Sequence, residues 1–360
     1  MTLVLESVTR RVGPETHIRD VSLALPKGSL NVLLGQTLAG KTSLMRLMAG
    51  LDAPSEGRIR VDGADVTGWP VQRRNVAMVY QQFINYPSLS VYENIASPLR
   101  VARLPRAEIE ARVREAARLL KLEPHLGRRP LELSGGQQQR TALARALVKR
   151  ADLVLMDEPL ANLDYKLREE LREELPRIFA ETGAVFVYAT TEPAEALLLG
   201  GHTAALHRGR VTQFGPTPEV YRRPHDLTTA QVFSDPPLNT LRVVKANGRV
   251  TLPTGGQARA AGTFAGVPDG TYTLGFRAHH LALDPIPDAV ALPATVSVAE
   301  ITGSESFVHI DAGEHRLIAL LAGVRRFEPG TAVTAYLDPR HALLFDAGGR
   351  TAALDLPAAA

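Results

Sequence analysis

The chain of 360 residues contains no cysteine, which excludes disulfide bonds, thiolate zinc sites and a cysteine nucleophile. It also lacks any run near the roughly 18 apolar residues that a membrane-spanning helix needs. No sign of charge dominates: 41 Lys and Arg against 38 Asp and Glu leave a net charge of +3, which by itself does not indicate nucleic acid. Aromatic residues make up only 5%, and basic and aromatic residues do not interleave as in nucleic-acid surfaces. Charges within the first 13 residues argue against a secretory signal and predict a cytoplasmic address.

The length predicts two or three domains, and the pattern of apolar and polar residues changes near residue 225. Before that point, short apolar runs alternate with helical stretches, which is typical of a parallel sheet covered on both faces. We expect strands at 29–34, 75–80, 152–156 and 184–190, and a helix over 105–120 with Pro105 in its first turn. After residue 225, short strand-like pieces at 272–276, 295–298, 307–310 and 332–336 predict a small all-β domain.

A glycine-rich segment fits the pattern G-x-x-x-x-G-K-[ST] between an expected strand and an expected helix. Such a loop points backbone N–H groups at phosphates, and the following helix adds its positive N-terminal dipole. Lys41 would neutralise the β- and γ-phosphates, and the Thr42 hydroxyl would ligate Mg²⁺. The alternative is a glycine turn with an incidental lysine. The predicted nucleotide-binding residues are Gly35, Gln36, Thr37, Leu38, Ala39, Gly40, Lys41, Thr42 and Ser43.

Two carboxylates, Asp157 and Glu158, end the apolar run 153–156. Ligands of parallel sheets bind beyond the carboxyl ends of the strands. Asp157 would therefore hold Mg²⁺, and Glu158 could act as the general base for an attacking water. The alternative, a polar strand end before a turn at Pro159, is weakened by the phosphate loop upstream.

The segment L-S-G-G-Q-Q-Q-R at 133–140 precedes a helical stretch at 141–149, with Ser134 as its expected N-cap. A bare S-G-G would indicate only a helix start. Placed between the phosphate loop and the acidic strand end, it resembles the signature of ATP-binding cassette (ABC) ATPases. Gln81 and the segment A-N-L-D at 161–164 resemble that family's glutamine loop and dimer loop, and the resemblance covers residues 3–240.

The resemblance implies a phosphate-loop (RecA-like) α/β domain at 1–235 with a helical subdomain at about 88–150, followed by an all-β OB-fold-type regulatory and dimerisation domain at 240–360. Two such cassettes close head to tail on two ATP molecules, each with Mg²⁺. The implied Mg²⁺ residues are Thr42, Gln81 and Asp157. Those implied to reach the partner's nucleotide or the dimer interface are Ser134, Gly135, Gly136, Gln137 and Asp164.

Three positions depart from the family pattern. Thr191 stands where the family has a switch histidine, and Val12 stands where an aromatic ring stacks on adenine. Leu38 replaces an inner glycine of the phosphate loop. One interpretation is neutral drift. The other is an asymmetric pair, in which this chain's own site is weakened and its signature completes the site of a second, different ATPase subunit.

The segment 87–100 and the C-terminal motifs L-G-F-R at 274–277 and G-S-E at 303–305 resemble the carbohydrate and polyol importer branch. Segments 35–51 and 80–87 are similar to one ATPase of the two-ATPase glycerol importers. The resemblance implies a peripheral motor subunit on the cytoplasmic membrane face, working with two permease subunits and, indirectly, a solute-binding protein. Alternatives are a non-hydrolysing regulatory ATP-binding subunit and a soluble repair or translation ATPase. His279 and His280 are expected on opposite faces of a strand, which argues against a shared metal.

Overall fold

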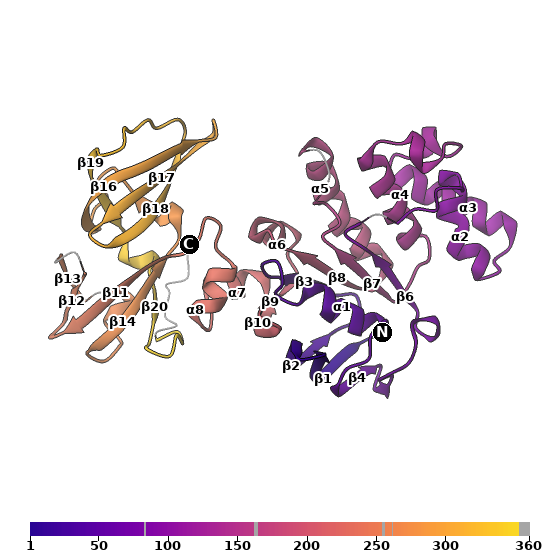
Figure 1. The fold of residues 1–360 in the computed structure, drawn as a ribbon, viewed down its shortest axis with the longest axis horizontal. Helices are drawn as coiled ribbons and strands as arrows, with labels where there is room; N and C mark the ends of the chain where they lie inside the picture. The colour runs from indigo at the N-terminus through magenta and orange to yellow at the C-terminus, as the bar shows by residue number, and fades with distance from the viewer. Residues whose placement is uncertain (83, 162–164, 254–255, 261, 353–360) are drawn as a thin grey trace. The chain divides into compact units, whose positions relative to one another are not determined.

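The computed structural model describes residues 1–82, 84–161, 165–253, 256–260 and 262–352 (Figure 1). The chain packs as two compact units, Met1–Pro218 and Glu219–Ala360. Within the described ranges, no helix is both long and apolar enough to cross a membrane.

A six-stranded sheet in the order β10-β9-β3-β8-β7-β6 forms the centre of the first unit. All the neighbours run parallel except β9 and β10. Each of the four expected strands is confirmed to within one residue at either end. Because the strands run parallel, the carboxyl ends of β3, β7 and β8 meet at one edge. The strands are β3 (Leu30–Leu34), β6 (Val76–Val79), β7 (Leu153–Asp157), β8 (Val185–Thr190), β9 (His202–His207) and β10 (Arg210–Pro216).

A second sheet of the first unit is antiparallel, in the order β2-β1-β4-β5, and the sequence did not predict it. The register between β1 and β2 shifts between Leu5 and Val8, again before Arg10 and again before Arg11. These bulges interrupt the alternation of apolar and polar residues that identifies a half-buried strand. The strands are β1 (Leu3–Val12), β2 (Glu15–Leu25), β4 (Glu56–Val61) and β5 (Ala64–Asp65).

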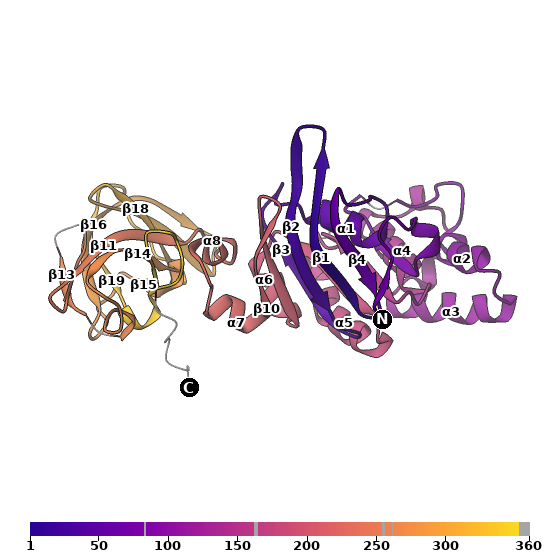
Figure 2. The ribbon, with the colours of Figure 1, turned by 90° about the horizontal axis from the view of Figure 1, so that it is seen from below.

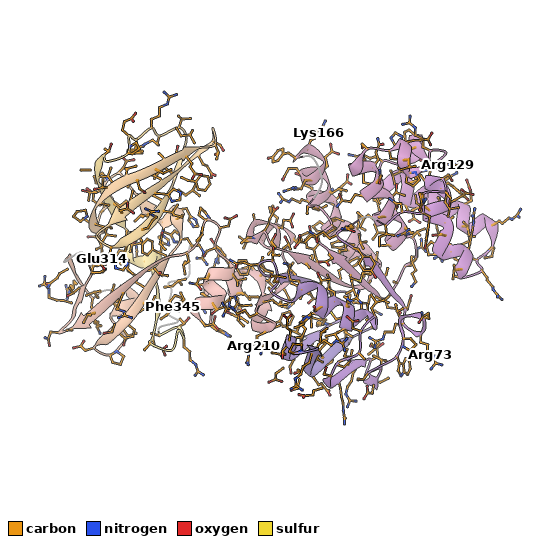
Figure 3. All side chains as sticks on the ribbon, in the orientation of Figure 1. Arg73, Arg129, Lys166, Arg210, Glu314 and Phe345 are labelled. Atoms are coloured by element: carbon orange, nitrogen blue, oxygen red, sulfur yellow. The ribbon has the colours of Figure 1, made fainter. Side chains whose placement is uncertain are left out.

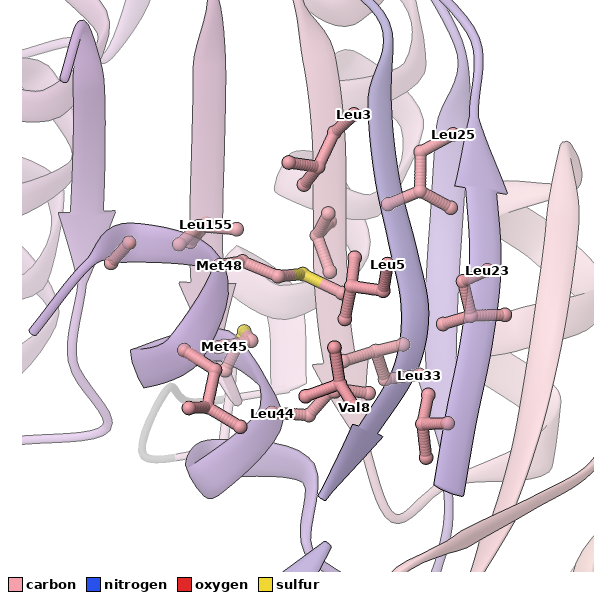
Figure 4. Close-up of a cluster of buried hydrophobic side chains, with 14 of the residues drawn as sticks. Leu3, Leu5, Val8, Leu23, Leu25, Leu33, Leu44, Met45, Met48 and Leu155 are labelled. Atoms are coloured by element: carbon pink, nitrogen blue, oxygen red, sulfur yellow. The ribbon is translucent and has the colours of Figure 1, made fainter. Parts of the chain in front are cut away.

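Helix α1 (Lys41–Ala49) packs between these two sheets (Figure 4). Its buried side chains include Leu44, Met45 and Met48, which share one core with Leu5 of β1 and Leu155 of β7. This burial fixes the helix, and with it the loop that immediately precedes its first residue.

The other helices of the first unit fall into two groups (Figure 2). Helices α5 (Tyr165–Thr182) and α6 (Pro193–Leu199) lie on the opposite face of the parallel sheet from α1, where Phe179 stacks on Phe186 of β8 at 4.0 Å. The helical subdomain contains α2 (Val91–Val101), α3 (Arg106–Leu119) and α4 (Gly135–Leu147). The helix expected over 105–120 is confirmed as α3, but Pro105 is its N-cap and does not lie in the first turn. Short 3₁₀ turns lie at Val71–Arg73, Glu123–His125 and Pro130–Glu132.

In its described residues the second unit is all-β apart from two short helices and three 3₁₀ turns, which confirms the expected OB-fold-type domain. Its sheets, β13-β12-β11-β14-β20 and β15-β19-β16-β17-β18, share one core. Phe345, labelled in Figure 3, is completely buried. The helices are α7 (Thr217–Arg222), which crosses the division between the units, and α8 (Leu227–Val232). The strands are β11 (Asn239–Ala246), β12 (Arg249–Thr251), β13 (Gln257–Arg259), β14 (Gly270–Phe276), β15 (Leu281–Ala282), β16 (Val290–Ile301), β17 (Glu305–Ala312), β18 (His315–Ala322), β19 (Ala332–Leu337) and β20 (Leu343–Phe345).

The expectation that His279 and His280 lie in a strand is wrong, because both belong to the 3₁₀ turn Ala278–His280. Their rings meet edge to face at 4.2 Å, and His280 stacks on His341 at 4.4 Å. Two further 3₁₀ turns of this unit lie at Gly262–Phe264 and Pro339–His341.

The pKa of His280 is strongly lowered in the fold. Burial lowers it most, followed by the charges of His279, His341 and Arg277, and Asp338 opposes them, which leaves a pKa of about 3.

Acidification is therefore expected to destabilise the second unit. The pKa of His280 is lower in the folded chain than in the unfolded one. Its contribution is complete above pH 6.5 and is lost as the pH falls toward 3. The loss is at most about 1.4 kcal/mol per pH unit. Amide hydrogen exchange of β14 at pH 7.5 and 5.0 measures it. His280→Gln should flatten the dependence, and His315→Gln is the control. An equal dependence in both variants would contradict the assignment.

Candidate active site

The predicted phosphate loop follows β3 directly, at the carboxyl edge of the parallel sheet. A Cβ on Gly35 would lie 2.6 Å from the Leu206 carbonyl oxygen, and Gly40 has a φ of +105°. Both positions therefore require glycine. The Gly35 amide donates to the Thr190 carbonyl at 3.3 Å, and this bond ties the loop to the end of β8.

Lys41 is buried and folds back over its own loop. Its Nζ donates to the carbonyl oxygens of Gly35 at 2.7 Å and Gln36 at 3.2 Å, and lies 3.3 Å from Glu158 Oε1. The N-cap of α1 is Gly40, which has no side chain to cap the helix. The first N–H groups of α1 are thus left without a side-chain acceptor, beside a buried ammonium. This arrangement fits a phosphate.

Thr42 and Asp157 are held together as a pair of oxygen donors. The Thr42 hydroxyl donates to Asp157 Oδ2 at 2.7 Å, and Asp157 is 4% exposed. Burial raises the pKa of Asp157, and the hydrogen bond from Thr42 opposes this rise. No group of three or more His, Cys, Asp or Glu able to hold a metal occurs among the described residues. Mg²⁺ needs no such cage, since it is commonly held by one or two carboxylates, waters and phosphate oxygens, and these two donors suit that mode.

Asp157→Asn is expected to stabilise the ligand-free chain. A pKa raised by folding means that folding stability falls as the pH rises above 3.8, so ionisation of the buried carboxylate costs stability above that pH. Asparagine removes the buried charge and can still accept the Thr42 hydrogen. Thermal unfolding should show a gain of about 2 °C or more, the shift that roughly 1 kcal/mol produces in a domain of this size.

In the same variant, Mg²⁺ together with ATP should raise the melting temperature no more than ATP alone does, since a neutral amide is a weaker ligand for Mg²⁺. Asp152→Asn, at the other end of β7, is the matched control. A lower melting temperature for Asp157→Asn without ligand would contradict the prediction.

Glu158 has a φ of +46°, a left-handed conformation that is uncommon for a residue with a side chain. Its amide donates to the Ala189 carbonyl at 3.0 Å, which fixes it between β7 and β8. The side chain accepts a hydrogen bond from Gln81 Nε2 at 3.0 Å and faces Lys41. Backbone strain held in place by such bonds is common at functional sites. The structure thus brings together Lys41, Gln81, Asp157 and Glu158.

The three departing residues are all exposed. Val12 ends β1 with its side chain 46% exposed, and Thr191 follows β8 directly. Leu38 is 94% exposed and has a φ of +67°. A leucine is strained there where a glycine would not be. Gln36, Thr37 and Thr42 are also exposed, Ala39 is buried, and Ser43 is partly buried.

The predicted signature begins helix α4 at Gly135, six residues earlier than the expected helical stretch. Ser134 is confirmed as the N-cap. Its hydroxyl accepts the Gln137 amide, and Gln137 Oε1 accepts the Ser134 amide at 3.0 Å. Gln137 Nε2 lies 3.2 Å from His125 Nε2. Burial lowers the pKa of His125, which favours its neutral ring as acceptor. A Cβ on Gly135 would meet open space. Asp164 lies outside the described residues.

A cluster of charges around α5 was missed at the sequence level. Arg172 pairs with Glu192 at 2.8 Å and with Glu195 at 3.1 Å. Arg168 pairs with Glu192 at 3.1 Å. The spacings i, i+4 for the arginines and i, i+3 for the glutamates place each pair on one helix face. That signal indicates a charged face but does not identify which element it meets.

The parallel sheet, the phosphate loop and the Thr42–Asp157 and Lys41–Glu158 pairs define a phosphate-loop nucleotide-binding domain. The pattern of the ABC transporter family matches residues 18–161, and that of the TOBE domain matches residues 274–345. The sn-glycerol-3-phosphate import ATP-binding protein UgpC of Paracoccus denitrificans is 36% identical over 347 residues, covering 96% of this chain and 97% of that protein. The chain belongs to the ABC transporter family.

Other relatives agree with this assignment. The trehalose/maltose import ATP-binding protein MalK of Thermococcus litoralis is 36% identical over 362 residues, covering 95% of this chain and 96% of that protein. The spermidine/putrescine import ATP-binding protein PotA of Methylococcus capsulatus is 45% identical over 225 residues, covering 62% of this chain and 58% of that protein. The dimeric post-hydrolysis structure of the ATP-binding cassette MJ0796, bound to ADP and Pi, aligns with a TM-score of 0.55 and 28% identity over 60% of this chain and 98% of that one.

These comparisons confirm the predicted membership of the carbohydrate and polyol importer branch. The chain is an ABC-type transporter ATPase.

Proposed function

We propose that this chain hydrolyses ATP to drive the import of a small polyol or carbohydrate, glycerol or a glycerol derivative among them. The single observation that carries the proposal is the position of Glu158. It is held by Lys41 and Gln81 at the sheet edge, next to the Thr42–Asp157 pair. A carboxylate in that place can take a proton from a water that attacks the terminal phosphate.

The described side chains divide the chemistry among them. The N–H groups that begin α1 and the Lys41 ammonium bind the phosphates, and Thr42, Asp157 and Gln81 would hold Mg²⁺. When bound, Mg²⁺ neutralises phosphate charge. Glu158 accepts the proton of the attacking water while Lys41 stabilises charge on the phosphoryl oxygens. Positioning and fixed charge supply most of the catalysis in this reaction class.

Ser134, Gly135, Gly136 and Gln137 contact the nucleotide of a second cassette in this proposal. Gly135 supports it, because no atom of the described part of the chain crowds the position and its φ is not positive. The fold therefore does not need glycine there, and the clearance serves a group that approaches from outside. Asp164 is assigned to the dimer interface, and Val12 to the adenine.

Pairing with a second, different ATPase is the finer part of the proposal. Thr191 and Val12 favour it, since a hydroxyl cannot carry charge as an imidazole does and valine offers no ring face. The similarity to importer ATPases over nearly the whole chain gives this heteromeric pairing no support.

Two permease subunits are the proposed membrane partners, which would make this chain peripheral on the cytoplasmic membrane face. A groove of about 220 Å³ lies where α2 and α4 meet β6. Its lining includes the exposed Tyr86 and Val101, together with Arg145 and Lys149. Tyr86 belongs to the segment after Gln81, and buried Asn94 accepts its amide hydrogen at 2.7 Å. A permease loop in this groove would thus press on the segment that carries Gln81.

The solute class follows the relatives that match both units. UgpC and MalK match about 95% of the chain, whereas PotA matches 62%. The name of UgpC specifies sn-glycerol 3-phosphate, and that of MalK specifies trehalose or maltose. Polyhydroxylated solutes are therefore the proposed class.

Transport assays test the proposal directly. The chain, reconstituted with its permeases and solute-binding protein in proteoliposomes, should take up labelled glycerol, glycerol 3-phosphate or maltose only with internal ATP. Uptake of putrescine alone would overturn the solute class. ATP binding without hydrolysis, restored by Thr191→His, would favour the non-hydrolysing regulatory subunit instead.

A further inference from the structure

Arg168 of α5 joins two loops that flank the proposed site of hydrolysis. Its Nη1 lies 3.1 Å from Glu192 Oε1, and its Nη2 donates to the carbonyl oxygen of Ala161 at 3.4 Å. Ala161 begins the segment that resembles the dimer loop, and Glu192 directly follows Thr191. One guanidinium thus contacts the segment after β7 and the turn after β8.

Each end of this bridge is bonded onward to a site residue. The Ala161 amide donates to the Glu158 carbonyl at 3.3 Å. On the other side, the Glu192 amide donates to Thr190 Oγ1 at 3.0 Å, and the Thr190 carbonyl accepts the Gly35 amide. A continuous path of hydrogen bonds therefore runs from the backbone of Glu158 through Arg168 to the phosphate loop.

A buried carboxylate, Glu195, stabilises the turn after β8. Glu195 is 4% exposed and accepts hydrogen bonds from Thr190 Oγ1 at 2.6 Å and Tyr188 at 3.1 Å. Arg172 pairs with both Glu195 and Glu192, and its side chain is 12% exposed. Glu195 and Arg172 therefore hold the turn in one place, while Arg168 connects it to Ala161.

We infer that Arg168 is a positioning residue, which fixes the distance between Glu158 and the turn that carries Thr191. The inference rests on the proposed function, in which those residues face the terminal phosphate. A threonine hydroxyl reaches less far than an imidazole, so its contact with a phosphate depends closely on where the turn lies. A misplacement of about 1 Å at such a site can cost on the order of 100-fold in rate.

The first readout needs no ATP. Glu192→Gln removes the carboxylate that Arg168 contacts at the turn after β8. The amide exchange of Ala161, at the other end of the Arg168 bridge, should then rise at least about threefold by local opening. Arg168→Gln should raise exchange at both Ala161 and Glu192. The double variant should resemble Arg168→Gln. Arg177→Gln, an exposed arginine of the same helix, is the matched control and should change neither.

The second readout separates rate from binding. Arg168→Gln should lower kcat for ATP hydrolysis about 10- to 100-fold, with KM for ATP changed less than about threefold. Arg168→Lys should recover only part of the rate, because an ammonium lacks the planar fork that reaches two acceptors.

The outcomes distinguish this inference from the proposed function. Unchanged Ala161 exchange in Glu192→Gln, or a kcat for Arg168→Gln within twofold of wild type, would overturn the inference and leave the function standing. A wild-type chain that binds no ATP would overturn the function. If Arg168→Gln fails to fold, the exchange of Glu192→Gln and the kcat of Arg168→Lys still decide the question.

Discussion

Replacing Glu158 with glutamine is expected to lower kcat for ATP hydrolysis by about 10²- to 10⁴-fold, the usual contribution of a general base. An amide cannot take the proton of the attacking water, whereas its oxygen can still accept the hydrogen bond from Gln81. The substitution removes the ion pair with Lys41, but Lys41 keeps its hydrogen bonds to the carbonyl oxygens of Gly35 and Gln36, so ATP affinity should not fall by more than about threefold. Hydrolysis rates and binding of a fluorescent ATP analogue measure the two effects separately.

Glu115→Gln is the control for this prediction, because Glu115 is an exposed glutamate of α3 that pairs with Arg150, away from the residues of the proposed site. It should leave both quantities unchanged. A drop in kcat of less than about fivefold for Glu158→Gln would show that another group takes the proton.

Ser134→Arg is expected to abolish hydrolysis by the paired complex, with a residual rate below about 1%. The hydroxyl caps α4, and an arginine would fill the open space beside Gly135 where the partner's nucleotide is proposed to lie. The chain's own phosphate loop should still bind ATP with unchanged affinity. Hydrolysis and binding are measured on the same preparation. Survival of hydrolysis would contradict the assignment of the signature to a second nucleotide.

Mixing Ser134→Arg with Lys41→Ala identifies the partner. In a head-to-tail pair of this chain, the mixed dimer holds one site with both defects and one intact site. Random mixing should then restore about a quarter of wild-type hydrolysis. Such recovery would make the heteromeric pairing wrong. If two different ATPases pair, both variants occupy the same place and mixing restores nothing. A candidate second ATPase added to either variant then tests that arrangement.

The parts of the site that lie close together in sequence were predictable. The loop at 35–42 and the Asp157–Glu158 end carry their chemistry in consecutive residues, and their order along the chain indicated the family. The antiparallel sheet was missed because the bulges after Leu5 break its periodicity. The start of α4 was placed late because Gly135 and Gly136 are poor helix formers, although S-x-x-Q at 134–137 is a capping box.

Arg168 could not be predicted for a different reason. Its two acceptors, Ala161 and Glu192, are a backbone carbonyl and a carboxylate 31 residues apart. Only the packing of α5 against the sheet brings them to one guanidinium. A sequence pattern records the charge on a helix face, but the neighbour of that face is decided by tertiary structure.

The ion pair between Lys41 and Glu158 has a consequence for the proposed hydrolysis. The Lys41 ammonium and the Glu158 carboxylate neutralise each other, with only 6% and 18% of their side chains exposed. Opening such a pair leaves each partner uncompensated unless a new charge replaces the lost one. In the proposed function, a polyanion that draws Lys41 away would thereby free Glu158 to act as a base. In the proposed mechanism, ATP itself would thus activate the carboxylate that its hydrolysis requires.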